Sequence, residues 1–389
     1  MHPPATSAYS NSGERTRLPV LAGYVPVIDG LRAVSIAFVL LSHYSMFDQT
    51  ASWLYSFGTS LGELGVSIFF VISGYLITGL LLREEDCNGR IDLPRFYGRR
   101  FLRIFPAAYT FILVILILSV AGIITVAPHT YLASLLYIRN FVGNGHETAH
   151  LWSLAVEEQF YLLWPTALVF LRPSKRLRIA SLAVCLILAW RTFLVLGSHL
   201  RYGAVYERTD VRLDTILVGC ILALLVRNKC FAKWNQYILS NAAVGWAGCL
   251  TVALAFWAGN RWPVFASVEW SIIPVGIGLA INCVLQSKDT WVTQLLRLKP
   301  VIFLGKLSYS LYLWQQLFLG PVAGKMAPLR SFPLNLAFAF TLALASYYIV
   351  EKPALRLKDR RFGVRRADAD ATRLRAPSAG PLAVAAEGS

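Results

Sequence analysis

The sequence predicts an all-α integral membrane protein, a bundle of about ten transmembrane helices whose N- and C-termini both lie in the cytoplasm. Three observations predict this fold: the composition, the long apolar runs and the placement of the basic residues. Of the 389 residues, 56% are hydrophobic and only 15% are charged. A soluble domain is nearer half apolar and a quarter charged. The chain is therefore too apolar, and too poor in charge, for an ordinary soluble protein.

The long apolar runs predict where the spans lie, because a helix needs roughly 20 apolar residues to cross a bilayer. In chain order the predicted spans are 28–46, 65–82, 102–123, 152–171, 177–196, 212–226, 238–258, 269–286, 300–319 and 331–350. Together they predict one transmembrane domain over residues 25–358. We find no internal repeat of the inverted kind that many transporters contain.

The two ends of the chain differ in composition from this domain. Residues 1–24 contain Pro3, Pro4 and several Ser and Thr, and residues 359–389 are rich in Ala, Arg and Pro. Segments with so little to bury in a core remain disordered, so we predict disordered cytoplasmic ends. The N-terminus lacks the short apolar core and small-residue cleavage site of a signal peptide, and we expect the first span to stay in the membrane.

The formal net charge of +16 is explained by topology rather than by nucleic-acid binding. With both termini inside, 29 of the 37 Lys and Arg residues belong to the cytoplasmic side and 6 to the outside loops. Cytoplasmic segments of membrane proteins carry such an excess, and anionic lipid is their default partner. We therefore predict a multi-pass protein of the cell inner (cytoplasmic) membrane, with membrane lipid and not nucleic acid as a partner.

The six cysteines stand singly, and none belongs to a C-x-x-C pair. Four of them fall in predicted spans, where a lone cysteine acts as a small apolar filler. The sequence predicts neither disulfides nor a metal site.

The first span carries two ionisable residues on one face. Arg32 and His43 are 11 residues apart, about three helical turns and roughly 16 Å along the axis. An ionisable group inside a bilayer is costly and marks a candidate functional site. Imidazole takes a proton from a hydroxyl near neutral pH, which makes His43 a candidate general base. The alternative is a histidine that hydrogen-bonds between helices.

A cluster of arginines follows the second span. Arg99, Arg100 and Arg103 lie within one helical turn of one another, so helical geometry brings their guanidiniums together. Guanidinium suits bidentate contact with phosphate. The alternative is an anchor whose charges reach lipid phosphates at the membrane surface.

The fourth span opens with a histidine and two adjacent carboxylates. His150 and Glu157 are seven residues apart and share a helix face, and Glu158 follows directly. Carboxylates this close to an apolar run need partners. A carboxylate behind an imidazole fixes its tautomer, as in a catalytic triad, and the alternative is a structural contact between helices.

Taken together, these motifs resemble the acyltransferase-3 family of membrane enzymes over about residues 24–358. The R-x10-H element matches Arg32 and His43, and R-x-x-R matches Arg100 and Arg103. Residues 65–75 and 152–161 resemble the family's second-span and fourth-span signatures, and weaker matches are 212–214, 308–314 and 351–353. Many members have a histidine after the Leu-Tyr-Leu-Trp run, where this chain has Gln315 followed by Gln316. Glutamine still donates and accepts hydrogen bonds.

The resemblance implies an enzyme with ten transmembrane helices. It implies an acyl-CoA donor, most often acetyl-CoA, that enters from the cytoplasm. The acceptors it implies are usually sugars of cell-surface polymers or their lipid-linked precursors. In this interpretation Arg32, Arg100 and Arg103, with Arg99 beside them, bind the coenzyme A phosphates, and no metal takes part.

His43 is then the general base, with Glu157 and His150 orienting or stabilising it. A covalent acyl-imidazole relay is the alternative mechanism. Two alternative functions remain: O-acylation of a small glycosylated metabolite such as a macrolide, and transport of a sugar-lipid without chemistry.

Overall fold

The computed structural model describes residues 24–47, 52–142, 145–197, 205–228, 231, 241–261, 263–287, 290–322 and 324–362. Over these residues the protein is helical and has no strand. The two ends that were predicted to be disordered, residues 1–24 and 359–389, lie outside these described residues except for residues 24 and 359–362. Cys230 also lies outside them.

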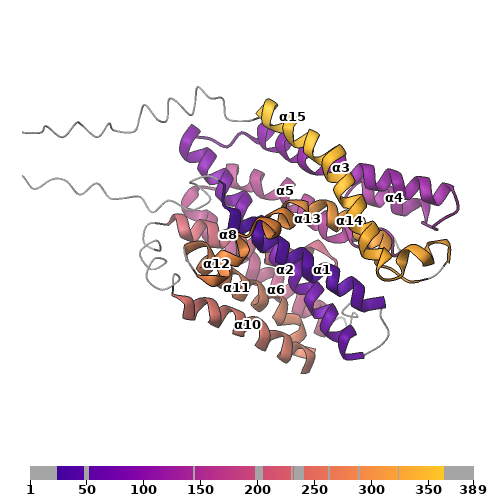
Figure 1. Cartoon of the computed structure of the whole chain (residues 1–389). Helices are drawn as coiled ribbons and strands as arrows, with labels where there is room; N and C mark the ends of the chain where they lie inside the picture. Colours follow the sequence, from indigo (N-terminus) through magenta and orange to yellow (C-terminus); the bar gives the residue numbers. More distant parts are fainter. Residues whose placement is uncertain are drawn as a thin grey trace, which may run out of the picture.

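Ten helices, labelled in Figure 1, overlap the ten predicted spans. They are α1 (Pro26–Phe47), α2 (Ser52–Asn88), α3 (Leu93–Val120), α5 (Leu151–Phe170), α6 (Pro173–Thr192), α8 (Thr209–Arg227), α10 (Ala242–Arg261), α11 (Pro263–Gln286), α13 (Lys299–Phe318) and α14 (Leu334–Ser346). Shorter elements join or extend them: α4 (Pro128–Leu135), η2 (Phe193–Gly197), α12 (Trp291–Leu296), η4 (Gly324–Arg330), η5 (Tyr347–Glu351) and α15 (Lys352–Phe362).

Within the described residues, seven helical stretches are long and apolar enough to cross a membrane. They belong to α1, α2, α3, α6, α10, α11 and α14 with its extension. The protein is therefore a multi-pass membrane protein. The other three helices at predicted spans, α5, α8 and α13, carry the motifs at 152–161, 212–214 and 308–314 and are largely buried. The total of ten spans and the cytoplasmic position of the termini stay predictions.

Two helices extend well beyond the apolar runs that predicted them. The helix α2 has 37 residues and begins 13 residues before the predicted span, and α3 begins at Leu93 rather than near 102. The segment 83–101, predicted as a loop, is thus mostly helix, with a short connection at 89–92. Asp92 caps α3 by accepting the backbone N–H of Arg95 at 3.0 Å. The predicted spans contain only apolar runs and leave out the polar residues at helix ends, which explains why α2 and α3 are longer than predicted.

Glycines let α2 and α8 approach closely. A Cβ on Gly74 of α2 would lie 2.0 Å from the carbonyl oxygen of Ile216, and one on Gly219 of α8 would lie 2.1 Å from that of Val71. Small residues at a helix contact let the backbones pack against each other within a membrane. This contact fixes the position of Ser73, next to Gly74, in the wall of the cavity described below.

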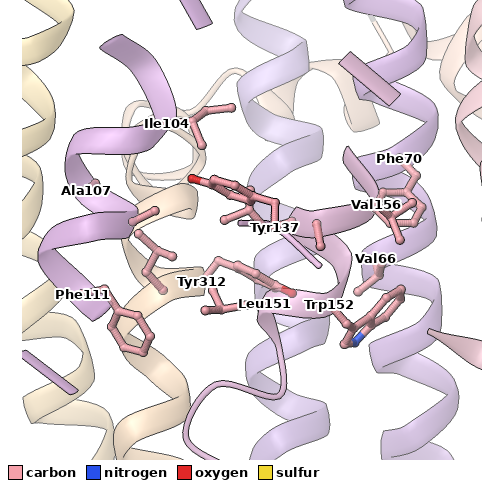
Figure 2. Packing of buried hydrophobic residues seen from close by; sticks show 14 of the residues in the cluster. Val66, Phe70, Ile104, Ala107, Phe111, Tyr137, Leu151, Trp152, Val156 and Tyr312 are labelled. Atoms are coloured by element: carbon pink, nitrogen blue, oxygen red, sulfur yellow. The ribbon is translucent and has the colours of Figure 1, made fainter. Parts of the chain in front are cut away.

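The main core lies where α2, α3, α5 and α13 meet. Figure 2 shows part of it, with Phe70 on α2, Phe111 on α3, Trp152 on α5 and Tyr312 on α13 in one cluster. The last helix, α15, lies along the first half of α3 (Figure 1), and Arg95 donates to the carbonyl oxygen of Phe362 at 3.0 Å. This arrangement holds the arginine-bearing start of α3 against the bundle.

Candidate active site

A cavity of about 450 Å³ lies between α1, α2, α3, α5 and α13. One end, which we call the arginine end, is lined by Arg32, Arg83, Arg100 and Arg103. The body of the cavity is mostly apolar, with Val66, Phe70, Ile72 and Leu76 on the α2 side among other residues. Ser153 and Tyr312 line it toward the opposite end of α1. The cavity thus connects a cluster of cations with a hydroxyl-bearing wall.

Local structure explains why the arginines converge. Arg100 and Arg103 are one turn apart on α3, and Arg32 lies in the second turn of α1. The guanidinium of Arg100 lies over the ring of Tyr161, 3.8 Å from its centroid, a cation–π contact that orients it. Glu351, which accepts from Ser310 at 2.8 Å, lies within electrostatic range of Arg32 and Arg103. This buried carboxylate partly balances the positive end.

The structure divides the predicted arginines into two groups. Arg32, Arg100 and Arg103 line the cavity, whereas Arg99 pairs with Glu84 at 3.0 Å and is not among the lining residues. Arg83, which the sequence analysis did not single out, lines the cavity instead. Its only signal in the sequence is its place at the end of the second apolar run.

Glu157 lies in the cavity wall, and its partners are hydroxyl groups. Its carboxylate accepts hydrogen bonds from Ser73 on α2 and from Tyr161 one turn further along α5, the latter at 3.1 Å. We expected this carboxylate to stand behind His43. Glu157 lines the cavity, and the described hydrogen bonds of its carboxylate come from hydroxyl groups and not from an imidazole.

A second cluster lies near the other end of α1, and we call it the histidine end. It consists of His43 on α1 and of His146, His150, Gln315 and Gln316 from other parts of the chain. His43 is partly buried, has the side chain of Gln315 beside it and lies within electrostatic range of His146. His150 is buried and lies within electrostatic range of both other histidines. The structure therefore brings together the predicted His43 and His150, with Gln315 as the polar neighbour of His43.

Tyr312 connects the cavity to the histidine end. Its hydroxyl lines the cavity, hydrogen-bonds with Ser153 and donates to the backbone carbonyl of His150. Its ring packs edge-on against the ring of His150, with 5.2 Å between centroids. Neither ring nitrogen of His150 has a hydrogen-bond partner among the described residues. Unpaired buried nitrogens are costly and are consistent with a site that binds a ligand.

His146 is the residue of this cluster that the sequence analysis missed. It lies in the segment before α5, and the side-chain nitrogen of Gln316 lies 3.1 and 3.3 Å from its two ring nitrogens. Burial lowers the pKa of His146, so the ring is neutral at neutral pH. A histidine in a polar loop gives no periodic signal, and only the fold shows that it reaches His43.

No group of three or more His, Cys, Asp or Glu residues in the described part of the chain could hold a metal ion. What the site offers is a cationic end suited to phosphate, an apolar passage and a cluster of imidazoles suited to proton transfer. These features define a multi-pass membrane protein with an internal cavity that is cationic at one end and apolar along its length.

Comparison with known proteins identifies the family. The family model described as an acyltransferase domain matches residues 25–352. The chain belongs to this family, acyltransferase-3.

The chain is similar to the O-acetyltransferase OatA of Staphylococcus aureus strain NCTC 8325 / PS 47 and to that of strain COL. Each is 32% identical over 358 residues, which cover 85% of this chain and 57% of the relative. The chain thus spans little more than half the length of these relatives. No solved structure matches it.

Proposed function

We propose that this protein transfers an acyl group, most often acetyl, from acyl-CoA to a hydroxyl of a cell-surface glycan or its lipid-linked precursor, in the cytoplasmic (inner) membrane. The observation that carries the donor assignment is the arginine end of the cavity. Four guanidiniums converge there on an apolar passage. Coenzyme A has the matching form, because its phosphates are at one end of a long pantetheine arm that ends in the thioester.

The length of the site supports the same donor. Arg32 and His43 lie on one helix, roughly 16 Å apart along its axis, and the cavity extends from Arg32 to Tyr312, which contacts His150. A pantetheine arm is about as long as this rise. Phosphates bound at the arginine end therefore place the thioester toward the histidine end.

His43 is the proposed general base. It takes the proton of the acceptor hydroxyl as the oxygen attacks the thioester carbonyl, and the carbon–sulfur bond breaks. The proton then passes to the coenzyme A thiolate, so that the products are an ester and free coenzyme A. His150 is the neighbouring imidazole. Glu157, hydrogen-bonded to Ser73 and Tyr161, shapes the thioester-facing wall in this proposal.

The OatA relatives are named O-acetyltransferases, which supports acetyl as the group and oxygen as the accepting atom.

Acetyl-CoA and acetyl-pantetheine test this function, because they share the thioester and differ in the phosphates. The purified protein in proteoliposomes should transfer labelled acetyl from acetyl-CoA to sugar acceptors, with a KM at least tenfold lower than for acetyl-pantetheine. Arg100→Ala should raise the KM for acetyl-CoA and leave that for acetyl-pantetheine unchanged. Equal use of both donors by the wild-type protein would refute phosphate binding at the arginine end.

A further inference from the structure

The cavity of the candidate active site is open at its arginine end. Three of the residues that line it are exposed: Tyr24, which precedes α1, and Leu80 and Arg83 near the C-terminal end of α2. The other lining residues are partly or fully buried. We call these three exposed residues the mouth of the cavity. A donor whose thioester lies toward the histidine end has its opposite end at this mouth.

Tyr24 presents an aromatic ring at the mouth. The residue is 64% exposed. Its hydroxyl donates to Oδ2 of Asp29 at 2.6 Å, and Nζ of Lys306 lies over the ring, 5.3 Å from its centroid. Among the described residues, no other ring packs against that of Tyr24. The hydroxyl therefore anchors the side chain, and the ring face away from the ammonium is accessible for stacking.

Close packing fixes the segment that carries this ring. A Cβ on Gly305 of α13 would lie 1.8 Å from the carbonyl oxygen of Asp29, and a Cβ on Gly30 would lie 2.4 Å from a backbone oxygen of α12. Glycine at these two positions lets the first turn of α1 lie directly against α12 and α13. Lys306 follows Gly305 in the chain, so the same contact brings its ammonium to Tyr24.

An accessible aromatic ring beside a cation has the chemistry of a nucleotide-binding site. Every base has a π-face that stacks on an aromatic side chain, and an ammonium binds phosphate as a point charge. Lys306 is exposed and has no carboxylate partner in the described part of the chain. The end of coenzyme A that is farthest from the thioester carries both matching groups, because its adenine and its 3′-phosphate are on one ribose.

We propose that the mouth binds the nucleotide end of coenzyme A: the adenine stacks on the ring of Tyr24, and Lys306 pairs with the 3′-phosphate. This proposal rests on the proposed function, in which acyl-CoA is the donor. The arginine end, further into the cavity, then holds the diphosphate. The protein therefore selects coenzyme A thioesters over acyl groups carried on phosphopantetheine, which lacks the nucleotide.

Three donors separate the parts of this site. Acetyl-CoA carries adenine and the 3′-phosphate, acetyl-dephospho-CoA lacks the 3′-phosphate, and S-acetyl-4′-phosphopantetheine lacks the whole nucleotide. Calorimetry on the purified protein in detergent measures the Kd of each. Tyr24→Ala should weaken binding of the first two donors about fivefold or more, the effect of one stacked base, and leave that of the third within about twofold. Lys306→Ala should weaken binding of acetyl-CoA alone, about threefold to fivefold, as for an exposed charge pair.

Two further variants make the test specific. Tyr24→Phe keeps the ring and should retain the affinity for acetyl-CoA within about threefold. Tyr348→Ala is the matched control, because Tyr348 is 49% exposed and has Nζ of Lys352 4.8 Å from its ring centroid, but does not line the cavity. It should leave all three Kd values unchanged.

Two results for Tyr24→Ala would overturn the proposal: unchanged Kd values for all three donors, or an equal rise of all three, which would show that the residue only shapes the cavity. Either result leaves the donor assignment in place. A wild-type protein that binds no acetyl-CoA would instead refute the proposed function, and this proposal with it.

Discussion

His43 is the side chain on which the proposed chemistry depends most directly. Its polar neighbour is the amide of Gln315, and the imidazoles of His146 and His150 lie within electrostatic range. The carboxylate that a catalytic triad would place behind it, Glu157, bonds to Ser73 and Tyr161 instead. Among the described residues, Nδ1 of His43 and Oε1 of Gln315 have no hydrogen-bond partner, and none of these residues forms an ion pair with His43. The proposed base therefore lies in a neutral environment.

Substitution of His43 tests its role as base. His43→Ala and His43→Gln should both lower the turnover about 10²- to 10⁴-fold, because glutamine hydrogen-bonds but does not accept a proton at neutral pH. Glu157→Gln should be milder, since it keeps the base. The measurement is acyl transfer from labelled acetyl-CoA in proteoliposomes, with circular dichroism to confirm helix content. Turnover above about a tenth of wild type in His43→Gln would return His43 to a structural role.

Two adjacent arginines give a matched test of donor binding. Arg100 lines the cavity, and Arg99 pairs with Glu84 outside it. Arg100→Ala should weaken acetyl-CoA binding about tenfold to hundredfold, the effect of a lost charge-assisted contact of about 1.5–3 kcal/mol. Arg100→Lys should recover only part of it because the planar fork is lost. Arg99→Ala removes the same charge and should change affinity less than about threefold. Calorimetry measures the affinity of each variant for acetyl-CoA. Equal effects of the two alanine variants would contradict the assignment of Arg100 to phosphate binding.

At the scale of elements, the contact between α2 and α8 shapes the cavity. The pair of glycines sets how closely the two backbones approach, and Ser73 and Phe70, which line the cavity, are on α2 beside this contact. Any widening of the contact moves one wall of the cavity relative to α1 and α5. The site therefore depends on residues that do not line it.

Gly219→Ala should destabilise the protein and reduce activity, because the new Cβ would lie 2.1 Å from the carbonyl oxygen of Val71 and force the helices apart. Gly278→Ala on α11 is the control, since the nearest atom to its Cβ is 3.6 Å away, in ordinary contact. There alanine should be neutral or stabilise by up to about 1 kcal/mol. Melting temperatures in detergent measure both. A Gly219→Ala protein as stable as Gly278→Ala would show that the backbones separate without cost.

The predicted topology is tested by labelling. Cys87 is exposed at the end of α2, on the side where the basic residues gather, and should be cytoplasmic. A membrane-impermeant thiol reagent should label it only after the membrane is opened. In a variant that lacks Cys87, the exposed His129→Cys on α4 should be labelled in intact spheroplasts. Labelling of Cys87 from outside intact spheroplasts would contradict the predicted topology.

At the scale of the whole molecule, a buried ion pair ties three helices together. Arg191 on α6 and Asp214 on α8 are both fully buried and 2.9 Å apart. Arg191 also donates to the carbonyl of Ser267 at 2.7 Å, and Ser271 donates to Asp214 at 2.6 Å, both from α11. Two charges removed from water require this many partners.

Asp214→Asn should therefore be strongly destabilising, by about 3–5 kcal/mol, because it leaves the guanidinium of Arg191 buried without a countercharge. Asp210→Asn is the matched control. Asp210 pairs with Arg208 at 2.7 Å, but both side chains are about one third exposed, and such pairs contribute about 1 kcal/mol or less. Chemical unfolding in detergent measures both variants. Similar losses from the two variants would mean that burial does not set the strength of the inner pair.

The sequence by itself determined the features that depend on local geometry. Apolar runs predicted where the ten helices lie, and the spacing of Arg32 and His43 placed both on one face of α1. Helical periodicity also predicted that Arg100 and Arg103 lie together, and the order of the motifs identified the family. These inferences need only the rise and period of a helix and the cost of polar groups in a bilayer.

Only the tertiary structure decided which side chains meet. Ser73 and Glu157 are 84 positions apart, and Gln316 and His146 are 170 apart, so no local pattern relates them. Periodicity assigns a residue to a face of its helix but does not say which helix packs there. For this reason the sequence gives no signal for Arg83 or His146. It also does not predict that Arg99 pairs with Glu84 or that Glu157 accepts a hydrogen bond from Ser73.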